Sequence, residues 1–247
     1  MRTRQVSVSM LPQLVPPGGL TGRLAVVIDV LRATSTIVQA MSAGARSVSP
    51  CMTPEDAVRV REVATTEHVI LGGERGALPV PGFDLGNSPQ QYTPSVVEGK
   101  TVALSTTNGT RAILGCLEAD EVLIACFGNA SAVADALARD GRPVHLVCSG
   151  TNGAIAAEDC LVAGHVIERL RMRVSGIEPC DSGRIVHAYS QQAAAEPGGV
   201  LRELRRSAGG TNLARVGLEE DIAWCSREDR TTVVPRYCKR TGGIING

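Results

Sequence analysis

The sequence predicts an α/β protein of three layers, α/β/α, with a largely parallel or mixed sheet at its centre. Two observations support this fold class. Short apolar runs that resemble buried strands alternate along the chain with segments whose apolar residues recur at helical spacing. Residues 24–28, 102–104 and 144–147 are such runs, and each is followed by a polar turn and a helical pattern. This repeated order favours an internal duplication of strand–anion turn–helix units, and the alternative is that segments equally rich in Thr and Ala look alike by chance.

Length and composition limit the classes of protein that the chain can belong to. Its 247 residues allow one large α/β domain, which we place at residues 1–235, or two intimately joined halves. A formal charge of zero and an aromatic content of 2% argue against a nucleic-acid partner. The chain has no apolar run of the roughly 20 residues that cross a bilayer, and its first residues lack the apolar block of a signal peptide. We therefore expect a cytoplasmic protein with no membrane partner, and leave open a homo-oligomer.

The cysteines and histidines do not predict a zinc or redox centre. The eight cysteines are scattered and include no Cys-x-x-Cys pair, and the four histidines lack the spacing of metal ligands. Several cysteines lie in apolar runs, where a free thiol behaves as a small hydrophobic group.

The first half of the chain alternates predicted strands and helices. Strands are expected at residues 5–10, 24–28, 46–51, 68–71 and 102–104, and helices at residues 33–40 and 54–65. The second of these helices has Thr53 as its cap and Pro54 at its first position. Residues 72–89 contain five glycines and three prolines, so we expect a long packed loop without regular structure there.

The second half is richer in helices. Strands are expected at residues 121–125 and 144–147, with a further strand or edge segment at residues 232–235. Helices are expected at residues 112–117, 131–139, 154–170, 181–195, 198–207 and 218–224. The tail, residues 236–247, is rich in Gly and Arg, and we expect it to be disordered.

The polar turns after the three apolar runs are the candidate binding sites. In the segment 105–111, the first amides of the predicted helix would bind a phosphate, sulfonate or carboxylate, and Arg111 would add a guanidinium fork. Ligands bind beyond the carboxyl ends of parallel strands, so the three turns would converge if their strands are neighbours. An ordinary turn with a Thr or Asn cap is the alternative interpretation.

Two further segments carry groups that can bind an anion or a metal. The loop at residues 72–89 is one, although its charges are also compatible with an ordinary surface loop. The other is the pair Glu158 and Asp159, which cannot share one helix face and which also favour the helix dipole. The substrate-binding candidates from the loop and the turns are Glu74, Arg75, Asp84, Asn87, Ser88, Thr106, Thr107, Asn108, Gly109, Thr110, Ser149 and Gly150.

With these segments in view, the chain resembles the 2-phosphosulfolactate phosphatase family of coenzyme M biosynthesis. The resemblance rests on residues 27–37, 72–75, 82–89, 105–111, 158–164 and 217–221. It implies a single phosphatase domain and a magnesium-dependent enzyme that releases phosphate and 3-sulfolactate from 2-phospho-3-sulfolactate. The chain departs from the family at residues 155–157, where Ile-Ala-Ala replaces an aromatic and a hydroxyl, and this puts the substrate pocket in doubt at that point.

Oxygen ligands suit Mg²⁺, so we expect Asp29 to bind the ion together with Glu158 or Asp159. Arg32, Arg75 and Arg111 would hold the acidic groups of the substrate, and either water or Asp29 would attack the phosphorus. The residues expected to carry catalysis are Asp29, Arg32, Arg111, Glu158 and Asp159.

Two other functions use the same turns. One is a non-catalytic protein that binds or senses a small anion, and the other is a phosphatase of another small phosphorylated 2-hydroxy acid. Carboxylates among arginines favour an enzyme, because a pure anion receptor gains nothing from negative charge at its site.

Overall fold

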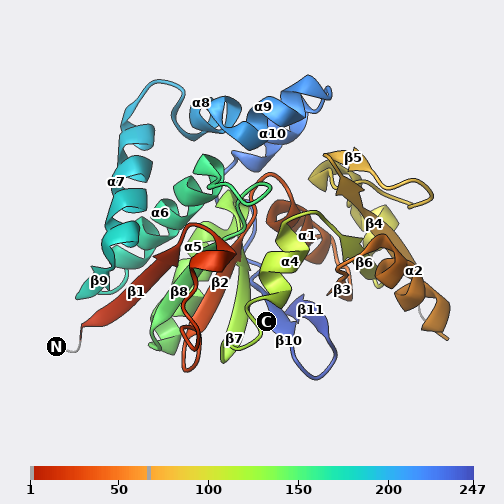
Figure 1. The fold of residues 1–247 in the computed structure, drawn as a ribbon, viewed down its shortest axis with the longest axis horizontal. Helices are drawn as coiled ribbons and strands as arrows, with labels where there is room; N and C mark the ends of the chain where they lie inside the picture. The colour runs from red at the N-terminus through yellow and green to blue at the C-terminus, as the bar shows by residue number, and fades with distance from the viewer. Residues whose placement is uncertain (1–2, 66–67) are drawn as a thin grey trace.

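The structure, a computed structural model, describes residues 3–65 and 68–247, and its centre is a sheet of 11 strands in that part of the chain (Figure 1). The strands are β1 (Arg4–Ser9), β2 (Leu24–Ile28), β3 (Ser47–Pro50), β4 (Val69–Arg75), β5 (Leu78–Pro79), β6 (Thr101–Ser105), β7 (Glu121–Ala125), β8 (Val144–Cys148), β9 (Ile177–Pro179), β10 (Pro235–Cys238) and β11 (Gly243–Asn246). Their order in the sheet is β5-β4-β6-β3-β11-β10-β7-β2-β8-β1-β9.

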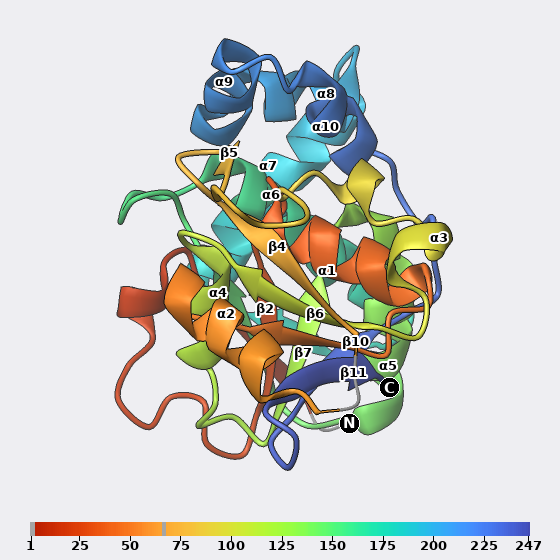
Figure 2. The same ribbon diagram turned by 90° about the vertical axis from the view of Figure 1, so that its right-hand side faces the viewer.

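Helices flank this open sheet (Figures 1 and 2). They are α1 (Ala33–Ser42), α2 (Pro54–Val63), α3 (Pro94–Val97), α4 (Gly109–Leu114), α5 (Ala130–Asp140), α6 (Ala157–Arg171), α7 (Asp181–Ala195), α8 (Gly199–Arg206), α9 (Ala208–Arg215) and α10 (Glu219–Cys225), with 3-10 turns η1 (Pro12–Leu14), η2 (Pro89–Gln91) and η3 (Phe127–Asn129). The predicted three-layer α/β/α class is confirmed. None of the helices in the described ranges is long and apolar enough to cross a membrane.

The sheet is mixed because a hairpin joins two parallel halves. Strands β4, β6 and β3 are parallel, as are β7, β2, β8, β1 and β9. The antiparallel hairpin β10–β11 lies between them, with Arg236 opposite Leu123 of β7 and Ile244 opposite Val48 of β3. The expectation of a disordered tail at residues 236–247 is therefore wrong. Ile244 is completely buried, and its burial in the core outweighs the Gly and Arg content.

The expectation of a loop without regular structure at residues 72–89 is also wrong in part. Strand β4 continues through Gly72 and Gly73 to Arg75, and the short strand β5 returns antiparallel to it. A Cβ on Gly73 would lie 2.1 Å from the carbonyl oxygen of Ser105, so glycine lets the end of β6 approach closely. Glycine in this strand marks close packing of backbones and does not interrupt the strand.

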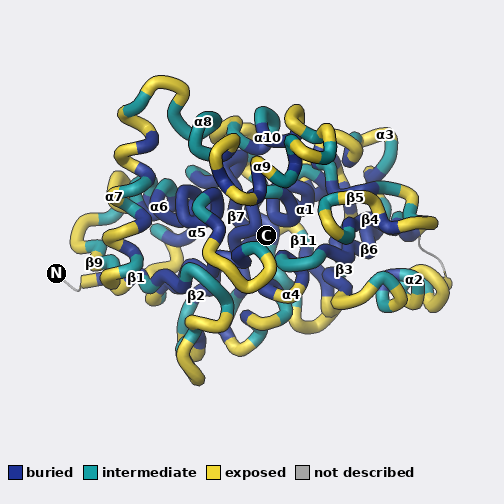
Figure 3. The backbone as a smooth tube through the Cα atoms, turned by 45° about the horizontal axis from the view of Figure 1, so that its top comes forward, coloured by how far each residue is buried: buried dark blue, intermediate teal, exposed yellow. Residues whose placement is uncertain are grey.

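The strands that lead into the three polar turns are buried along their whole length, and Figure 3 shows buried backbone in dark blue at the centre of the molecule. Strand β2 is a continuous apolar run, and β6 and β8 are apolar at most positions, as is typical of strands covered on both faces. Strands β2 and β8 are neighbours, whereas β6 belongs to the other half of the sheet. Helices α8, α9 and α10 lie above the ends of these strands (Figure 1).

Candidate active site

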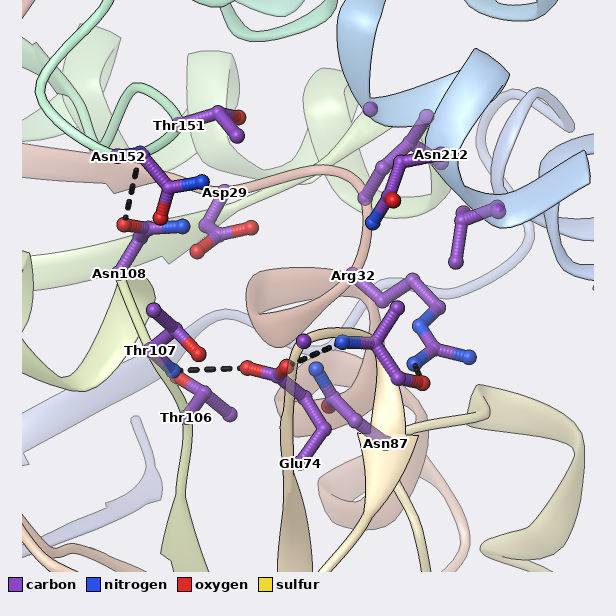
Figure 4. Close-up of a pocket in the computed structure, with 15 residues that line it drawn as sticks. Asp29, Arg32, Glu74, Asn87, Thr106, Thr107, Asn108, Thr151, Asn152 and Asn212 are labelled. Carbon is purple, nitrogen blue, oxygen red and sulfur yellow. Dashed lines mark hydrogen bonds between the residues drawn. The ribbon is translucent and has the colours of Figure 1, made fainter. Parts of the chain in front are cut away.

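A pocket of about 110 Å³ lies where the carboxyl ends of β2, β4 and β6 and the turn after β8 face α9 (Figure 4). Its position follows the rule that ligands of α/β sheets bind beyond the carboxyl ends of the strands. The three polar turns converge here even though β6 is not a neighbour of β2 or β8. The pocket is lined by Asp29, Leu31, Arg32, Glu74, Gly76, Ala77, Asn87, Thr106, Thr107, Asn108, Thr151, Asn152, Gly209, Asn212 and Leu213.

The turn after β6 is closed by its own side chains and by Glu74. Thr106 Oγ1 accepts a hydrogen bond from the backbone N–H of Thr110 at 3.1 Å. The N–H of Thr107 donates to Glu74 Oε1 at 2.7 Å, and the N–H of Ala77 donates to Glu74 Oε2 at 2.8 Å (Figure 4). The amides that we expected to bind an anion are thus partly occupied by a carboxylate of the protein. Glu74 binds the turn and also borders the pocket.

Gly109, which we expected to contact the substrate, has a packing role. A Cβ at this position would lie 2.4 Å from the Cβ of Ala33 and 2.7 Å from Oδ2 of Asp29. Glycine therefore allows the turn after β6 to lie directly against the turn after β2. Gly109 and Thr110 are buried beneath the pocket and do not line it.

Asp29 is the buried carboxylate at the centre of the converging turns. It follows β2 directly, and its Oδ1 accepts a long hydrogen bond of 3.4 Å from the N–H of Ala33. The pKa of Asp29 is raised to about 7, chiefly by burial; the neighbouring Glu74 and Glu158 also raise it, whereas hydrogen bonds with Ser149 and Ala33 lower it. Asp29 is therefore poised between its protonated and ionised forms at neutral pH.

The carboxylates of Glu158 and Asp159 point to different elements. Asp159 accepts hydrogen bonds from the N–H groups of Val30 (2.9 Å) and Gly150 (3.1 Å) and from Ser149 Oγ (3.0 Å). It thereby fixes the turns after β2 and β8 to each other from outside the pocket lining. Burial raises the pKa of Asp159 well above its usual range, and the charges of Asp29 and Glu158 add to this effect.

Glu158 reaches the helical roof of the pocket. Its Oε1 accepts a hydrogen bond of 3.1 Å from the N–H of Gly209 in α9, whereas its buried Oε2 has no partner among the described residues. Burial raises the pKa of Glu158 as well. The two carboxylates therefore have different roles: Asp159 organises the turns, and Glu158 keeps one oxygen without a partner among the described residues.

Of the three arginines expected to hold substrate, the structure places only Arg32 in the lining of the described pocket. Its Nη1 donates to Oδ2 of Asp221 at 2.6 Å, in a buried ion pair. Arg75 instead donates to the carbonyl oxygen and hydroxyl of Ser105, behind the turn after β6. Arg111 is exposed on α4 and does not line the pocket. The sequence correctly predicts that Arg111 lies close to the turn. It does not predict that the side chain lies on the exposed face of α4.

Of the other predicted site residues, Asn87 lines the pocket, whereas Asp84, Ser88, Ser149 and Gly150 lie outside its lining. The Asp84 carboxylate accepts a hydrogen bond from the N–H of Leu71 and pairs with Arg61 on the surface. Ser88 donates to Asp221. Asn87 lines the pocket, and its buried Oδ1 has no partner among the described residues. Ser149 and Gly150 do not line the pocket, and both donate hydrogen bonds to the carboxylate of Asp159.

Thr151, Asn152 and Asn212 also line the pocket, although they were not among the predicted site residues. One signal was present, because the sequence contains three Thr-Asn pairs, at residues 107–108, 151–152 and 211–212. The asparagine of each pair lines the pocket, and the N–H of Asn152 donates to Asn108 Oδ1 at 3.3 Å (Figure 4). The departure from the resembled family at residues 155–157 lies outside the lining, and Ile155 is exposed.

The donor set around the pocket fits Mg²⁺. The described residues contain no preformed group of three or more His, Cys, Asp or Glu side chains able to hold a metal. Three buried oxygens around the pocket nevertheless have no partner among them, namely Asn87 Oδ1, Thr107 Oγ1 and Glu158 Oε2. Mg²⁺ binds oxygen ligands, keeps several waters and typically uses one or two carboxylates together with phosphate oxygens. Asp29 and Glu158 are the carboxylates that meet this description.

Comparisons with known proteins agree on one family. The model of a family described as 2-phosphosulpholactate phosphatase matches residues 9–240. A probable 2-phosphosulfolactate phosphatase of Symbiobacterium thermophilum is 39% identical over 224 residues, which cover 90% of this chain and 95% of that protein. A protein of the same description from Thermotoga petrophila is 40% identical over 223 residues, covering 90% and 92%, and one from Clostridium perfringens is 36% identical over 234 residues, covering 93% and 92%.

Proposed function

This chain belongs to the 2-phosphosulpholactate phosphatase family, and from that membership and the pocket we propose that it is a Mg²⁺-dependent phosphatase of 2-phospho-3-sulfolactate. The reaction hydrolyses the phosphate monoester and releases 3-sulfolactate and phosphate. Such monoesters are among the slowest substrates to react without a catalyst, so neutralising and positioning the phosphoryl oxygens must supply most of the acceleration.

The observation that supports this proposal most is a cluster of carboxyl groups for which the described pocket lining offers no unpaired cation. Asp29 and Glu74 line the pocket, and Glu158 and Asp159 lie directly behind it. Arg32 is the only cationic side chain among the described residues that line it, and Asp221 already pairs with Arg32. When these carboxyl groups are ionised, the arrangement repels an anion unless a cation enters as well. A simple anion receptor would gain nothing from it, whereas a phosphatase that binds Mg²⁺ and substrate together requires it.

The residues divide into those that would hold the ion and those that would orient the substrate. Asp29 and Glu158 would hold Mg²⁺, which supplies the positive charge that the phosphoryl oxygens need in the transition state. Asp159 keeps the turns after β2 and β8 at a fixed distance through its three hydrogen bonds. Glu74 keeps the turn after β6 in place.

Neutral amides line much of the remaining pocket. Asn87, Asn108, Asn152 and Asn212 line it beside Arg32. Amide N–H groups donate to the oxygens of a sulfonate or carboxylate without adding charge, and Arg32 adds one guanidinium. These donors suit a small substrate that carries a second acidic group besides its phosphate.

A phosphate-release assay on a panel of esters tests the proposal. The panel contains 2-phospho-3-sulfolactate, 2-phospholactate, which lacks the sulfonate, and a simple alkyl phosphate, each with Mg²⁺ and with excess EDTA. We expect hydrolysis only with the metal, and a kcat/KM for 2-phospho-3-sulfolactate about 10²-fold above that for the alkyl phosphate, because one charge-assisted hydrogen bond contributes about 1.5–3 kcal/mol.

Each other outcome identifies a different function. Undiminished turnover in EDTA would refute the metal requirement. Equal kcat/KM for 2-phospho-3-sulfolactate and 2-phospholactate would indicate a phosphatase of other phosphorylated 2-hydroxy acids. Binding of these esters without hydrolysis would indicate an anion-binding protein.

A further inference from the structure

The ion pair between Arg32 and Asp221 joins parts of the chain that are 189 residues apart in sequence. Arg32 lies between β2 and α1, and Asp221 lies in the first turn of α10. Their closest atoms are 2.6 Å apart, and both side chains are only 3% exposed. Two charges in such a position pay a large desolvation penalty, so an apolar pair of similar volume would stabilise the fold at least as well. The pair therefore requires an explanation beyond stability.

Asp221 is held in place by other groups besides Arg32. Its Oδ1 accepts hydrogen bonds from Ser88 Oγ at 2.6 Å and from Gln90 Nε2 at 3.3 Å, while Oδ2 accepts from Arg32. Ser88 follows Asn87, which lines the pocket. The carboxylate is thus fixed from both sides and has little freedom to follow a moving arginine.

The Arg32 guanidinium is held at one edge and still borders the pocket. Nη1 donates to Asp221, and Nη2 donates to the carbonyl oxygen of Ala77 at 2.8 Å. Figure 4 shows Arg32 on the opposite side of the pocket from Thr107 and Asn108. An anion bound near Asp29 would therefore reach Arg32 with its other end. A planar fork binds oxygens well only when its orientation is fixed.

We infer that Asp221 is a positioning residue for substrate selectivity, because it fixes the Arg32 guanidinium where the second acidic group of the substrate binds. The inference rests on the proposed function for the identity of that substrate. Asp221 itself lies behind Arg32 and does not line the pocket. The ion pair also connects α10 to the pocket lining. Helix α10 follows α9, which supplies Asn212.

A double-mutant cycle tests this inference. Asp221→Asn is made in the wild type and in Arg32→Gln, and the measured quantity is the ratio of kcat/KM for 2-phospho-3-sulfolactate to kcat/KM for an alkyl phosphate. This ratio does not depend on the fraction of folded enzyme. We expect Asp221→Asn to lower the ratio about 30-fold in the wild type, since a small misplacement can cost up to about 10²-fold. In Arg32→Gln we expect a change below about two-fold.

The matched control is Glu220→Gln, which removes a carboxylate from the exposed neighbouring position of the same helix and should leave the ratio unchanged. An equal drop in both Arg32 backgrounds, or an unchanged ratio in Asp221→Asn, would overturn the inference. If Asp221→Asn does not fold, Ser88→Ala replaces it, since this change keeps both charges and removes only the hydroxyl that fixes Asp221. It should lower the ratio about three-fold, and only while Arg32 is present.

If the wild-type protein hydrolyses none of the esters, the proposed function is refuted. The inference about Asp221 is then tested by measuring binding. In that case 3-sulfolactate is titrated calorimetrically, with Mg²⁺ present, into the same variants. The inference then requires that Asp221→Asn weaken Kd at least ten-fold in the wild type and not in Arg32→Gln. Equal Kd values, or no binding to the wild type, would overturn it.

Discussion

The two ends of the sheet hold carboxylates in opposite electrostatic conditions. Where β7 and β8 begin, Asp140 accepts hydrogen bonds of 2.7 Å and 2.6 Å from Arg142, which lowers the pKa of Asp140. Glu121 in the same cluster pairs with Arg142 and Arg236. Where β2 ends, burial and neighbouring carboxylates raise the pKa of Asp29 to about 7. At the first end Asp140 and Glu121 pair with arginines, whereas at the other the only arginine in the described pocket lining pairs with Asp221 and not with Asp29.

This difference separates charges that support the fold from charges that serve a ligand. The paired cluster is partly exposed to solvent, and such pairs contribute little to stability. The pocket cluster costs stability, because buried like charges favour unfolding or protonation. A protein that retains such a cluster gains from it only when a cation or a proton binds there.

The largest effect is expected from Asp29→Asn. Removing this carboxylate should lower kcat for 2-phospho-3-sulfolactate about 10³-fold or more, because a residue at the reacting centre is lost. Asp140→Asn is the matched control from the opposite cluster and should stay within about two-fold of the wild type. Phosphate release with saturating Mg²⁺ measures both, and circular dichroism verifies the fold. An Asp29→Asn enzyme with a tenth of wild-type kcat would place the reacting centre elsewhere.

The same substitution should change how stability depends on pH in the metal-free protein. The folded state keeps a proton on Asp29 up to about pH 7, whereas the unfolded chain loses it near the ordinary pKa of 3.8. Between these values the unfolded state binds fewer protons, so stability falls as pH rises, by up to about 4 kcal/mol for this group. Urea unfolding in EDTA from pH 4.5 to 8 should show this loss in the wild type and a smaller loss in Asp29→Asn. Parallel pH profiles for the two proteins would contradict the account.

A smaller effect is expected from Asn212→Ala. The amide of Asn212 lines the pocket from α9, and loss of one hydrogen bond to a charged group should lower kcat/KM about ten-fold or more. The exposed neighbour on the same helix gives the control Thr211→Ala, which should be close to wild type. Wild-type kinetics in Asn212→Ala would mean that α9 does not contact the substrate through this side chain.

The smallest effect is expected from Arg111→Lys. Since Arg111 is exposed and lies outside the pocket lining, kcat/KM should remain within about two-fold of the wild type. A ten-fold loss would show that α4 turns toward the substrate when the complex forms.

Local patterns were sufficient to predict much of the fold. Strands β2 and β7 and helix α7 begin and end where the apolar periodicity placed them. Asp29 and Thr106 could be predicted as site residues because they directly follow buried strands, whose ends converge in a sheet of this class; Glu74 lies at the carboxyl end of β4. These predictions depend only on sequence neighbours and on the general geometry of parallel sheets.

The rest depends on contacts between distant segments. Asn212 enters the pocket because α9 folds over the strand ends, and Asp221 meets Arg32 from α10. Ile244 enters the core because the last hairpin fills the gap between two parallel halves of the sheet. Arg111 was misplaced because its exposure depends on how α4 packs. None of these contacts leaves a periodic signal in the sequence.

Calorimetric titration of Mg²⁺ into the metal-free protein tests the central claim most directly. The titration is made at pH 6.5 in two buffers of different ionisation enthalpy, so that protons released on binding are counted. A metal that binds carboxylates of raised pKa must displace their protons. We predict that the wild type binds Mg²⁺ with release of protons, and that Asp29→Asn binds more weakly and releases fewer. Absence of Mg²⁺ binding to the wild type, or equal proton release in the two proteins, would contradict the claim.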